Sequence, residues 1–230
     1  EQAWGNLQQE IPGTPKAKVY GYLSQFSNYN TFVDTVFNPK SKQQEVILAF
    51  SEEMFLNDTF PAYALLEMPP FFQRYNGSDQ VASQLIWNYL KMRFEPTHNR
   101  NNMLEEMLFQ GKLWYSLLTL FPDRNPWELL GYDETEWKWM MKEEGQIWKH
   151  FLDNKLLFSS KFNDYKRYFA FGNKTFGGGV PEDCPPLIGN FIGMRIAQTF
   201  AKKNEGNLDQ MWRNVNANQF LQASTYNPIK

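Results

Sequence analysis

Apolar side chains recur every three to four residues along much of the chain after residue 78, a period typical of amphipathic helices. The spacing predicts helices over about 78–94, 102–121, 133–151, 187–202 and 207–222. The third of these begins with the pattern of a capping box, because Asp133 precedes Glu136 by three residues. Pro96 and Pro122 follow the first two, where proline is expected to end a helix.

The N-terminal third of the chain has a less regular pattern. Residues 1–20 combine prolines and a glycine with few apolar anchors, which predicts an extended or flexible lead-in. Residues 20–37 are rich in aromatic side chains and are compatible with a helix, whereas the apolar run at 45–50 predicts a buried strand. No linker or repeat divides the sequence. We therefore predict one domain over 1–230 of the α+β class, mostly helical, with a small sheet.

Composition narrows the class of protein. Apolar residues make up 42% of the chain and aromatic residues 17%, enough for a bulky core, so global disorder is not expected. The 23 basic residues nearly balance the 25 acidic ones and form no cluster, so nucleic acid is not an expected partner. The longest strongly apolar run, residues 113–121, is shorter than the roughly 20 residues of a membrane span.

Known catalytic and metal-binding motifs are missing from the sequence. A zinc-hydrolase helix carries two histidines four residues apart, but His98 and His150 lie in different segments. Cys184 is the only cysteine, which rules out an intrachain disulfide and a multi-thiolate site. The glycine run after Phe176 lacks the Lys-Ser/Thr ending of a phosphate loop, and no nucleophile elbow is present. We expect no metal, no cofactor and no catalytic triad.

Four polar residues on predicted helices form a candidate polar pocket: Glu106, Gln110, Glu144 and Arg195. Glu106 and Gln110 are one helical turn apart, and they either reach water at the edge of the core or line a pocket. Glu144 lies on the apolar stripe of its helix, where a carboxylate has to be paired, hydrogen-bonded or protonated. Arg195 is the expected partner of Glu144, in a structural ion pair or in a functional pocket.

A candidate interaction surface consists of proline and phenylalanine side chains. Rigid proline beside aromatic rings offers contact area at a low cost of ordering, although such segments also simply cover a core. The residues are Pro69, Pro70, Phe71, Phe72 and Phe176.

Several blocks carry a resemblance to a known family when they are read in order. They include a strand leading into Phe-Ser-Glu-Glu-Met at 45–58, Met-Pro-Pro-Phe at 68–71, the helix at 105–115, Glu-Gly-Gln-Ile-Trp at 144–148, the segment 186–193 and Ser-Thr-Tyr-Asn-Pro at 224–228. Together they resemble the GldB family of gliding-motility lipoproteins from Bacteroidetes over roughly residues 40–230. That family is remotely similar to zinc peptidases of the gluzincin type.

The resemblance implies a zincin-like helical domain in which the helix at 103–115 would carry the zinc motif and Glu144 would lie near the third ligand. This sequence lacks both histidines of the motif. The resemblance therefore implies a degenerate peptidase-like frame that serves as a non-catalytic scaffold. The alternatives are a hydrolase or peptidase with a non-standard site near Glu106 and Glu144, and a glycan-binding envelope protein.

The resemblance also implies a place in the cell. The expected location is the outer membrane, facing the periplasm, with a lipid anchor on a cysteine upstream of Glu1. The expected partners are envelope proteins, among them components of gliding or secretion machinery.

Overall fold

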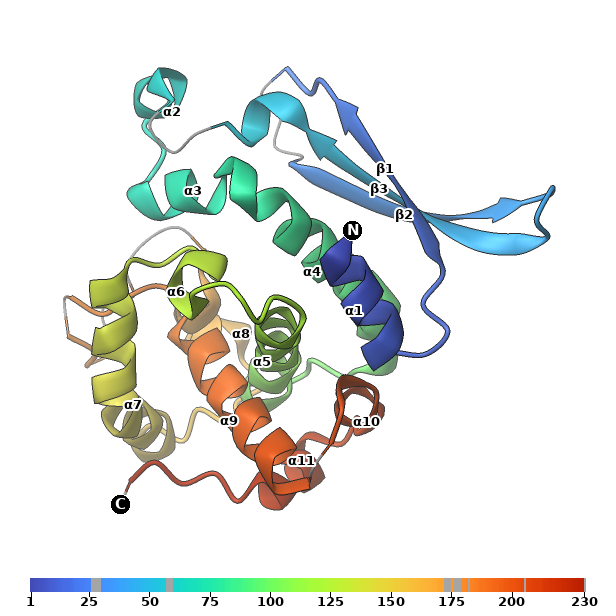
Figure 1. Ribbon diagram of the computed structural model, residues 1–230. Coiled ribbons are helices and arrows are strands. Elements are labelled where there is room, and N and C mark those ends of the chain that lie inside the picture. The colour runs from blue at the N-terminus through green and yellow to red at the C-terminus, as the bar shows by residue number, and fades with distance from the viewer. Residues whose placement is uncertain are drawn as a thin grey trace.

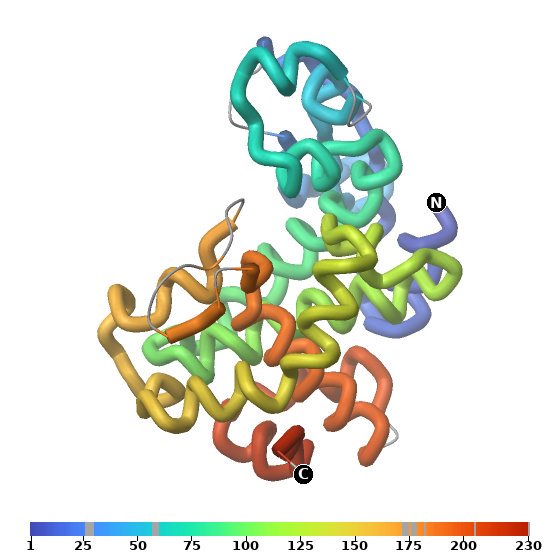
Figure 2. Tube along the Cα trace, turned by 90° about the vertical axis from the view of Figure 1, so that its left-hand side faces the viewer, coloured from blue at the N-terminus to red at the C-terminus, as the bar shows by residue number. Residues whose placement is uncertain are grey.

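The computed structural model describes residues 1–25, 30–56, 60–171, 175, 179–181, 183–204 and 206–229. Helices predominate and a small three-stranded sheet accompanies them, which confirms the predicted α+β class (Figure 1). Figure 2 shows the sheet and the short helices after it gathered at one end of the molecule, with the long helices at the other.

The sheet is formed by β1 (Lys16–Tyr22), β2 (Thr31–Asn38) and β3 (Gln43–Ser51), in the order β1-β3-β2. Strand β3 is parallel to β1 and antiparallel to β2. It contains the predicted strand at 45–50. Val46 and Leu48 point from it towards the core, where α4 (Val81–Phe94) packs against β2 and β3. One face of the sheet is thus covered by α4, as expected for a sheet with alternating burial.

The first 38 residues differ from the sequence-based prediction. In place of an extended lead-in, α1 (Gln2–Glu10) precedes β1, and β2 occupies part of the segment 20–37, for which the sequence is compatible with a helix. Contacts with α4 explain the difference for α1. Trp4 packs on Tyr89 with ring centroids 4.8 Å apart, and Arg93 donates hydrogen bonds to the Thr14 hydroxyl and the Pro12 carbonyl. These partners are about 80 residues away, beyond the reach of a local pattern.

The centre of the helical part is the pair α5 (Met103–Leu120) and α9 (Ile188–Asn204). The Asn102 side chain caps α5 by accepting from the Glu105 N–H. The two helices touch through glycine: a Cβ on Gly193 would lie 1.9 Å from the Met107 carbonyl oxygen. Only residues without a side chain allow this separation of the two backbones.

Helix α7 (Glu134–Asp153) begins with the predicted capping box between Asp133 and Glu136 and packs against α9. The single helix predicted over 207–222 is instead two helices, α10 (Leu208–Arg213) and α11 (Ala217–Ser224). The break has a physical cause. The Asn216 side chain caps α11, and the Asn214 carbonyl accepts a 2.6 Å hydrogen bond from the buried Lys112 ammonium.

Shorter helical elements connect these parts of the fold. They are α2 (Pro61–Leu65), α3 (Pro70–Tyr75), α6 (Pro126–Leu129) and α8 (Phe162–Tyr165), with 3₁₀ turns at Glu52–Met54, Ser78–Gln80, Glu95–Thr97 and Lys166–Phe169. Within the described part of the chain, no helix is both long and apolar enough to cross a membrane.

Candidate functional site

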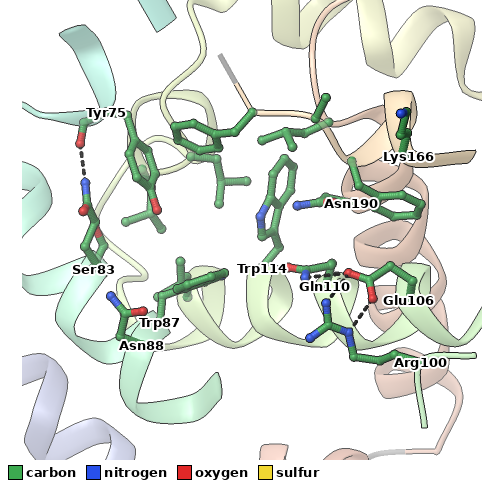
Figure 3. Close-up of a pocket in the computed structure, with 18 of the residues that line it drawn as sticks. Tyr75, Ser83, Trp87, Asn88, Arg100, Glu106, Gln110, Trp114, Lys166 and Asn190 are labelled. Atoms are coloured by element: carbon green, nitrogen blue, oxygen red, sulfur yellow. Dashed lines mark hydrogen bonds and ion pairs between the residues drawn. The ribbon is translucent and has the colours of Figure 1, made fainter. Parts of the chain in front are cut away.

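A cavity of about 810 Å³ lies between α4, α5, the start of α9 and the segment 162–171 (Figure 3). This volume is in the range of about 300–1,000 Å³ that is typical of small-ligand pockets. The helices that form it come from distant parts of the sequence, so the cavity depends on the tertiary packing of α5 against α9.

Aromatic side chains form most of the apolar wall. Tyr75 and Trp87 come from α3 and α4, and Trp114 comes from α5. Phe171 closes the wall, and its ring lies 4.7 Å from that of Tyr75 in an edge-to-face arrangement. Burial raises the pKa of the Tyr75 phenol, so this hydroxyl remains a neutral hydrogen-bonding group at physiological pH.

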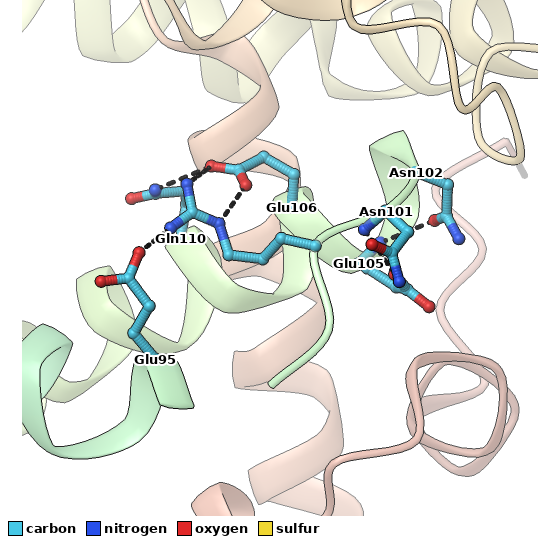
Figure 4. A network of polar contacts seen from close by, with 7 residues as sticks. Glu95, Asn101, Asn102, Glu105, Glu106 and Gln110 are labelled. Atoms are coloured by element: carbon cyan, nitrogen blue, oxygen red, sulfur yellow. Dashed lines mark hydrogen bonds and ion pairs between the residues drawn. The ribbon is translucent and has the colours of Figure 1, made fainter. Parts of the chain in front are cut away.

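Arg100, Glu106 and Gln110 form a polar network at the edge of the cavity (Figure 4). The Arg100 guanidinium donates to both carboxylate oxygens of Glu106, through Nε to Oε2 and through Nη2 to Oε1 at 2.9 Å. Gln110 adds a 2.9 Å hydrogen bond from its amide nitrogen to Glu106 Oε1. A second carboxylate, Glu95, pairs with the same guanidinium. Glu106, only 8% exposed, thus has both of its oxygens engaged.

Asn190 on α9 points into the cavity, and sequence reasoning missed it (Figure 3). The residue is 6% exposed, and its side-chain oxygen is one of the buried polar atoms that lack a hydrogen-bond partner among the described residues. The one signal in the sequence is a polar amide inside an otherwise apolar helix start, Leu-Ile-Gly-Asn-Phe-Ile at 187–192.

Two cations, Lys166 and Arg167, also line the cavity, and no pattern in the sequence singles them out. Lys166 is exposed and Arg167 is half-buried. Within the described ranges neither forms an ion pair. Lys166 lies on the side of the cavity nearest to Asn190, and Tyr75 lies on the opposite side.

The structure divides the four residues of the predicted polar pocket into two clusters. Glu106 and Gln110 line the cavity, whereas Glu144 and Arg195 do not. The predicted pairing of Glu144 with Arg195 is confirmed, with 3.0 Å between Oε1 and Nε. The same carboxylate oxygen accepts a 2.9 Å hydrogen bond from the Tyr226 hydroxyl. Glu144 therefore joins α7, α9 and the C-terminal segment.

The proline-phenylalanine segment is less exposed than the sequence predicts. Helix α3 turns Phe71 inwards, where it is 4% exposed and its ring lies 5.1 Å from that of Tyr132. The prediction of Phe71 as an exposed contact residue is therefore wrong. Phe72 is half-buried against Phe171, while Pro69 and Pro70 are half-buried and exposed, respectively. Phe176 lies outside the described residues.

The side chains around α5 do not fit a zinc ion. Both Glu106 oxygens are engaged by Arg100, and Gln110 turns an N–H towards Glu106. Over the described ranges no three His, Cys, Asp or Glu side chains gather in a way that could hold a metal. Burial lowers the pKa of His98 to about 4, assisted by the nearby Lys112 ammonium, and burial raises the pKa of the Cys184 thiol to about 12. Such a thiol stays protonated and unreactive.

A family model described as gliding motility protein GldB matches residues 1–228. No curated protein and no solved structure matches the chain. The family match therefore covers nearly the whole chain. The description of the site depends only on the structure.

Proposed function

Because the chain belongs to the family of the gliding motility protein GldB, a lipoprotein family of the cell envelope, we propose that it acts as a non-catalytic interaction scaffold beside the gliding machinery. Its partners in this proposal are envelope proteins, including gliding or secretion components. We place it on the outer membrane, facing the periplasm. The buried Cys184 is unsuited to carry a lipid, so the anchored cysteine would lie upstream of Glu1.

The arrangement around Glu106 supports the non-catalytic part of this proposal. In a peptidase-like frame, α5 would carry its two zinc ligands four residues apart, at the spacing of Glu106 and Gln110. Here Arg100 and Gln110 take up both oxygens of the carboxylate. A general base needs a free lone pair within reach of the substrate proton, and Glu106 would first have to break a largely buried ion pair. The frame is thereby suited to binding and not to hydrolysis.

A cleavage assay tests the non-catalytic role. Purified protein is incubated with a pool of fluorogenic peptides, with and without added Zn²⁺, and product is followed over hours. We expect no release above that of buffer. Cleavage that grows with enzyme concentration and disappears in Glu106→Gln would contradict the proposal and favour the alternative of a peptidase or hydrolase with a non-standard site.

A genetic experiment tests the link to gliding. In the bacterium that encodes this chain, the gene is deleted and spreading of single cells over a surface is recorded. We expect gliding to stop and to return with the wild-type gene, and the restored protein to fractionate with the outer membrane and to incorporate labelled fatty acid. Undiminished gliding in the deletion strain would remove the link, and a water-soluble, unlabelled product would remove the anchor.

A further inference from the structure

We propose that the cavity between α4, α5 and α9 binds the C-terminal end of a peptide, with the free carboxylate at Lys166 and Arg167 and a large apolar side chain against the aromatic wall. This inference deepens the scaffold role proposed above, because it names the chemistry of the partner. It rests on three features of the cavity: an amide without a partner, unpaired cations and aromatic rings.

The unpartnered amide requires a polar group inside the cavity. A buried carbonyl oxygen without a hydrogen bond is unfavourable, and proteins retain few such atoms without a reason. Asn190 Oδ1 is such an atom, and its side chain points into the open space. An amide offers a donor and an acceptor side by side, which matches the N–H and C=O groups of a peptide backbone.

The charges around the cavity favour an anionic end group. Glu106 is the only carboxylate among the described residues that line it, and Arg100 already neutralises Glu106. Lys166 and Arg167 are left without acidic partners in the described chain. A terminal carboxylate on the Lys166 side of the cavity would be attracted to both cations and could form a charge-assisted hydrogen bond.

The aromatic wall lies across the cavity from these polar groups. Tyr75 and Trp87 are on the side opposite Lys166, and Trp114 stands between the two sides (Figure 3). Aromatic rings supply a large apolar contact surface with few rotatable bonds. The cavity thus separates a polar end from an apolar end, as a terminal residue with a large side chain requires.

Two other ligands satisfy only part of this arrangement. A fatty acid would match the cations and the apolar wall but would leave the Asn190 oxygen without a donor. A glycan would stack on the tryptophans, but its hydroxyl groups are bound best by free carboxylates, and the one carboxylate at the cavity is engaged. The peptide terminus alone uses all three features.

The test measures binding of fluorescein-labelled hexapeptides to the purified chain by fluorescence anisotropy. The peptides end in Trp, Phe, Leu or Gly, each as the free acid and as the C-terminal amide. We expect the aromatic and leucine free acids to bind at least tenfold more tightly than their amides and than the glycine peptide. Equal affinity for acid and amide would overturn the proposal, as would tight binding of palmitate or of a cell-wall oligosaccharide with no binding of any peptide.

Two variants locate the site. Asn190→Leu removes the unpartnered oxygen, so we expect the melting temperature to stay the same or rise. We expect the affinity for the free-acid peptides to fall at least tenfold. Lys166→Gln with Arg167→Gln is expected to remove most of the preference for the acid over the amide. Its control, Lys202→Gln with Lys203→Gln on the exposed last turn of α9, makes the same change in net charge away from the cavity and is expected to bind like the wild type.

Unaltered peptide affinity in Asn190→Leu, or an equal loss in the control pair, would show that the peptide binds elsewhere. These measurements use purified protein and do not depend on gliding. Loss of gliding in the deletion strain with no peptide binding would keep the link to gliding and remove this ligand. Peptide binding without any gliding defect would keep this ligand and remove the link to gliding.

Discussion

Gly111 and Gly193 meet backbone to backbone where α5 crosses α9, so that a Cβ on Gly111 would lie 2.0 Å from the carbonyl carbon of Gly193. This crossing sets the positions of Glu106, Gln110 and Trp114 on α5 relative to Asn190 on α9. The close approach of α5 and α9 is thus required for the shape of the cavity as well as for the packing of the core.

Gly111→Ala should destabilise the protein. The added methyl group meets backbone atoms, which cannot move aside as a flexible side chain can. Because these contacts are with backbone, we expect the upper part of the about 1–3 kcal/mol that overpacking costs, about 2–3 kcal/mol, against the roughly 1 kcal/mol that alanine contributes in a helix interior. We therefore expect a net loss of about 1–2 kcal/mol in the free energy of unfolding, measured by urea denaturation.

Gly5→Ala is the matched control for Gly111→Ala. Gly5 also lies in a helix, α1, but nothing is within 4 Å of its added Cβ. At this position only the higher helix propensity of alanine over glycine should act, and we expect it to stabilise the protein by about 0.5–1 kcal/mol. If both substitutions shift stability in the same direction, the close approach at Gly111 does not govern the effect.

Glu144→Ala should destabilise the protein through two lost partners. The carboxylate is 12% exposed and accepts from Arg195 and from Tyr226. Breaking a fully buried pair costs about 3–5 kcal/mol, but Arg195 is 30% exposed and water can solvate it, so we expect about 2 kcal/mol. Glu143→Ala, a change at the neighbouring residue, should stay within about 0.5 kcal/mol.

Limited proteolysis gives an independent check of the Glu144 variant. Tyr226 holds the C-terminal segment against α7, where its ring also lies 5.3 Å from that of Trp148. Loss of the carboxylate should therefore release this segment to cleavage before the rest of the chain. A C-terminus as resistant as in wild type, together with an unchanged urea midpoint, would show that Glu144 contributes little to the fold.

Local patterns predicted the helices whose ends are fixed by neighbouring residues. The caps at Asn102 and Asp133 are such signals, and α5 and α7 begin where the sequence predicts. The same reasoning found the partner of Glu144, because a carboxylate on an apolar stripe needs a cation. It failed where contacts with residues far away in the sequence determine the local structure. Helix α1 and the turn after it are an example, because they are held by Tyr89 and Arg93.

The candidate site was predicted only in part for the same reason. Glu106 and Gln110 were found from their spacing on one helix. Their partner Arg100 comes from the turn before that helix, and Asn190 reaches the cavity only through the crossing of α5 and α9. Phe71 is buried because it lies in the short helix α3, which has Pro69 at its N-cap and begins at Pro70, a position where proline is compatible with a helix start.

Zinc should not bind stoichiometrically or stabilise the protein. A zinc site needs three or four well-placed donors, and the oxygens of Glu106 are engaged by Arg100 and Gln110. We expect elemental analysis to find well below one zinc per chain, and EDTA to leave the melting temperature within about one degree. One tightly held zinc, lost together with stability on chelation, would contradict this.

Stability should rise with pH between about 7 and 8.5 because of Lys112. Its ammonium is 2% exposed, and burial lowers its pKa to about 7 from the ordinary value of 10.5. Over this window the unfolded chain holds a proton at Lys112 that the folded protein has released, so the free energy of unfolding increases with pH. Below pH 7 both states are protonated and the unfavourable burial of the charge is fully present.

Urea midpoints at pH 6, 7, 8 and 8.5 measure this effect. The window stays below the ordinary pKa of 9.0 for the Cys184 thiol and of 10.0 for tyrosine, because burial raises the pKa of Cys184 and of Tyr75 and their ionisation in the unfolded chain would lower stability at higher pH. Lys112→Met removes the titrating group while it keeps an unbranched side chain near Phe220 and Trp212. We expect this variant to show a flatter pH dependence than the wild type and to be relatively most stable at pH 6, where the wild type has to bury a charge. A wild-type midpoint that falls from pH 7 to 8.5, or an identical slope in Lys112→Met, would show that Lys112 remains charged in the folded protein, held by the Asn214 carbonyl and the aromatic rings around it.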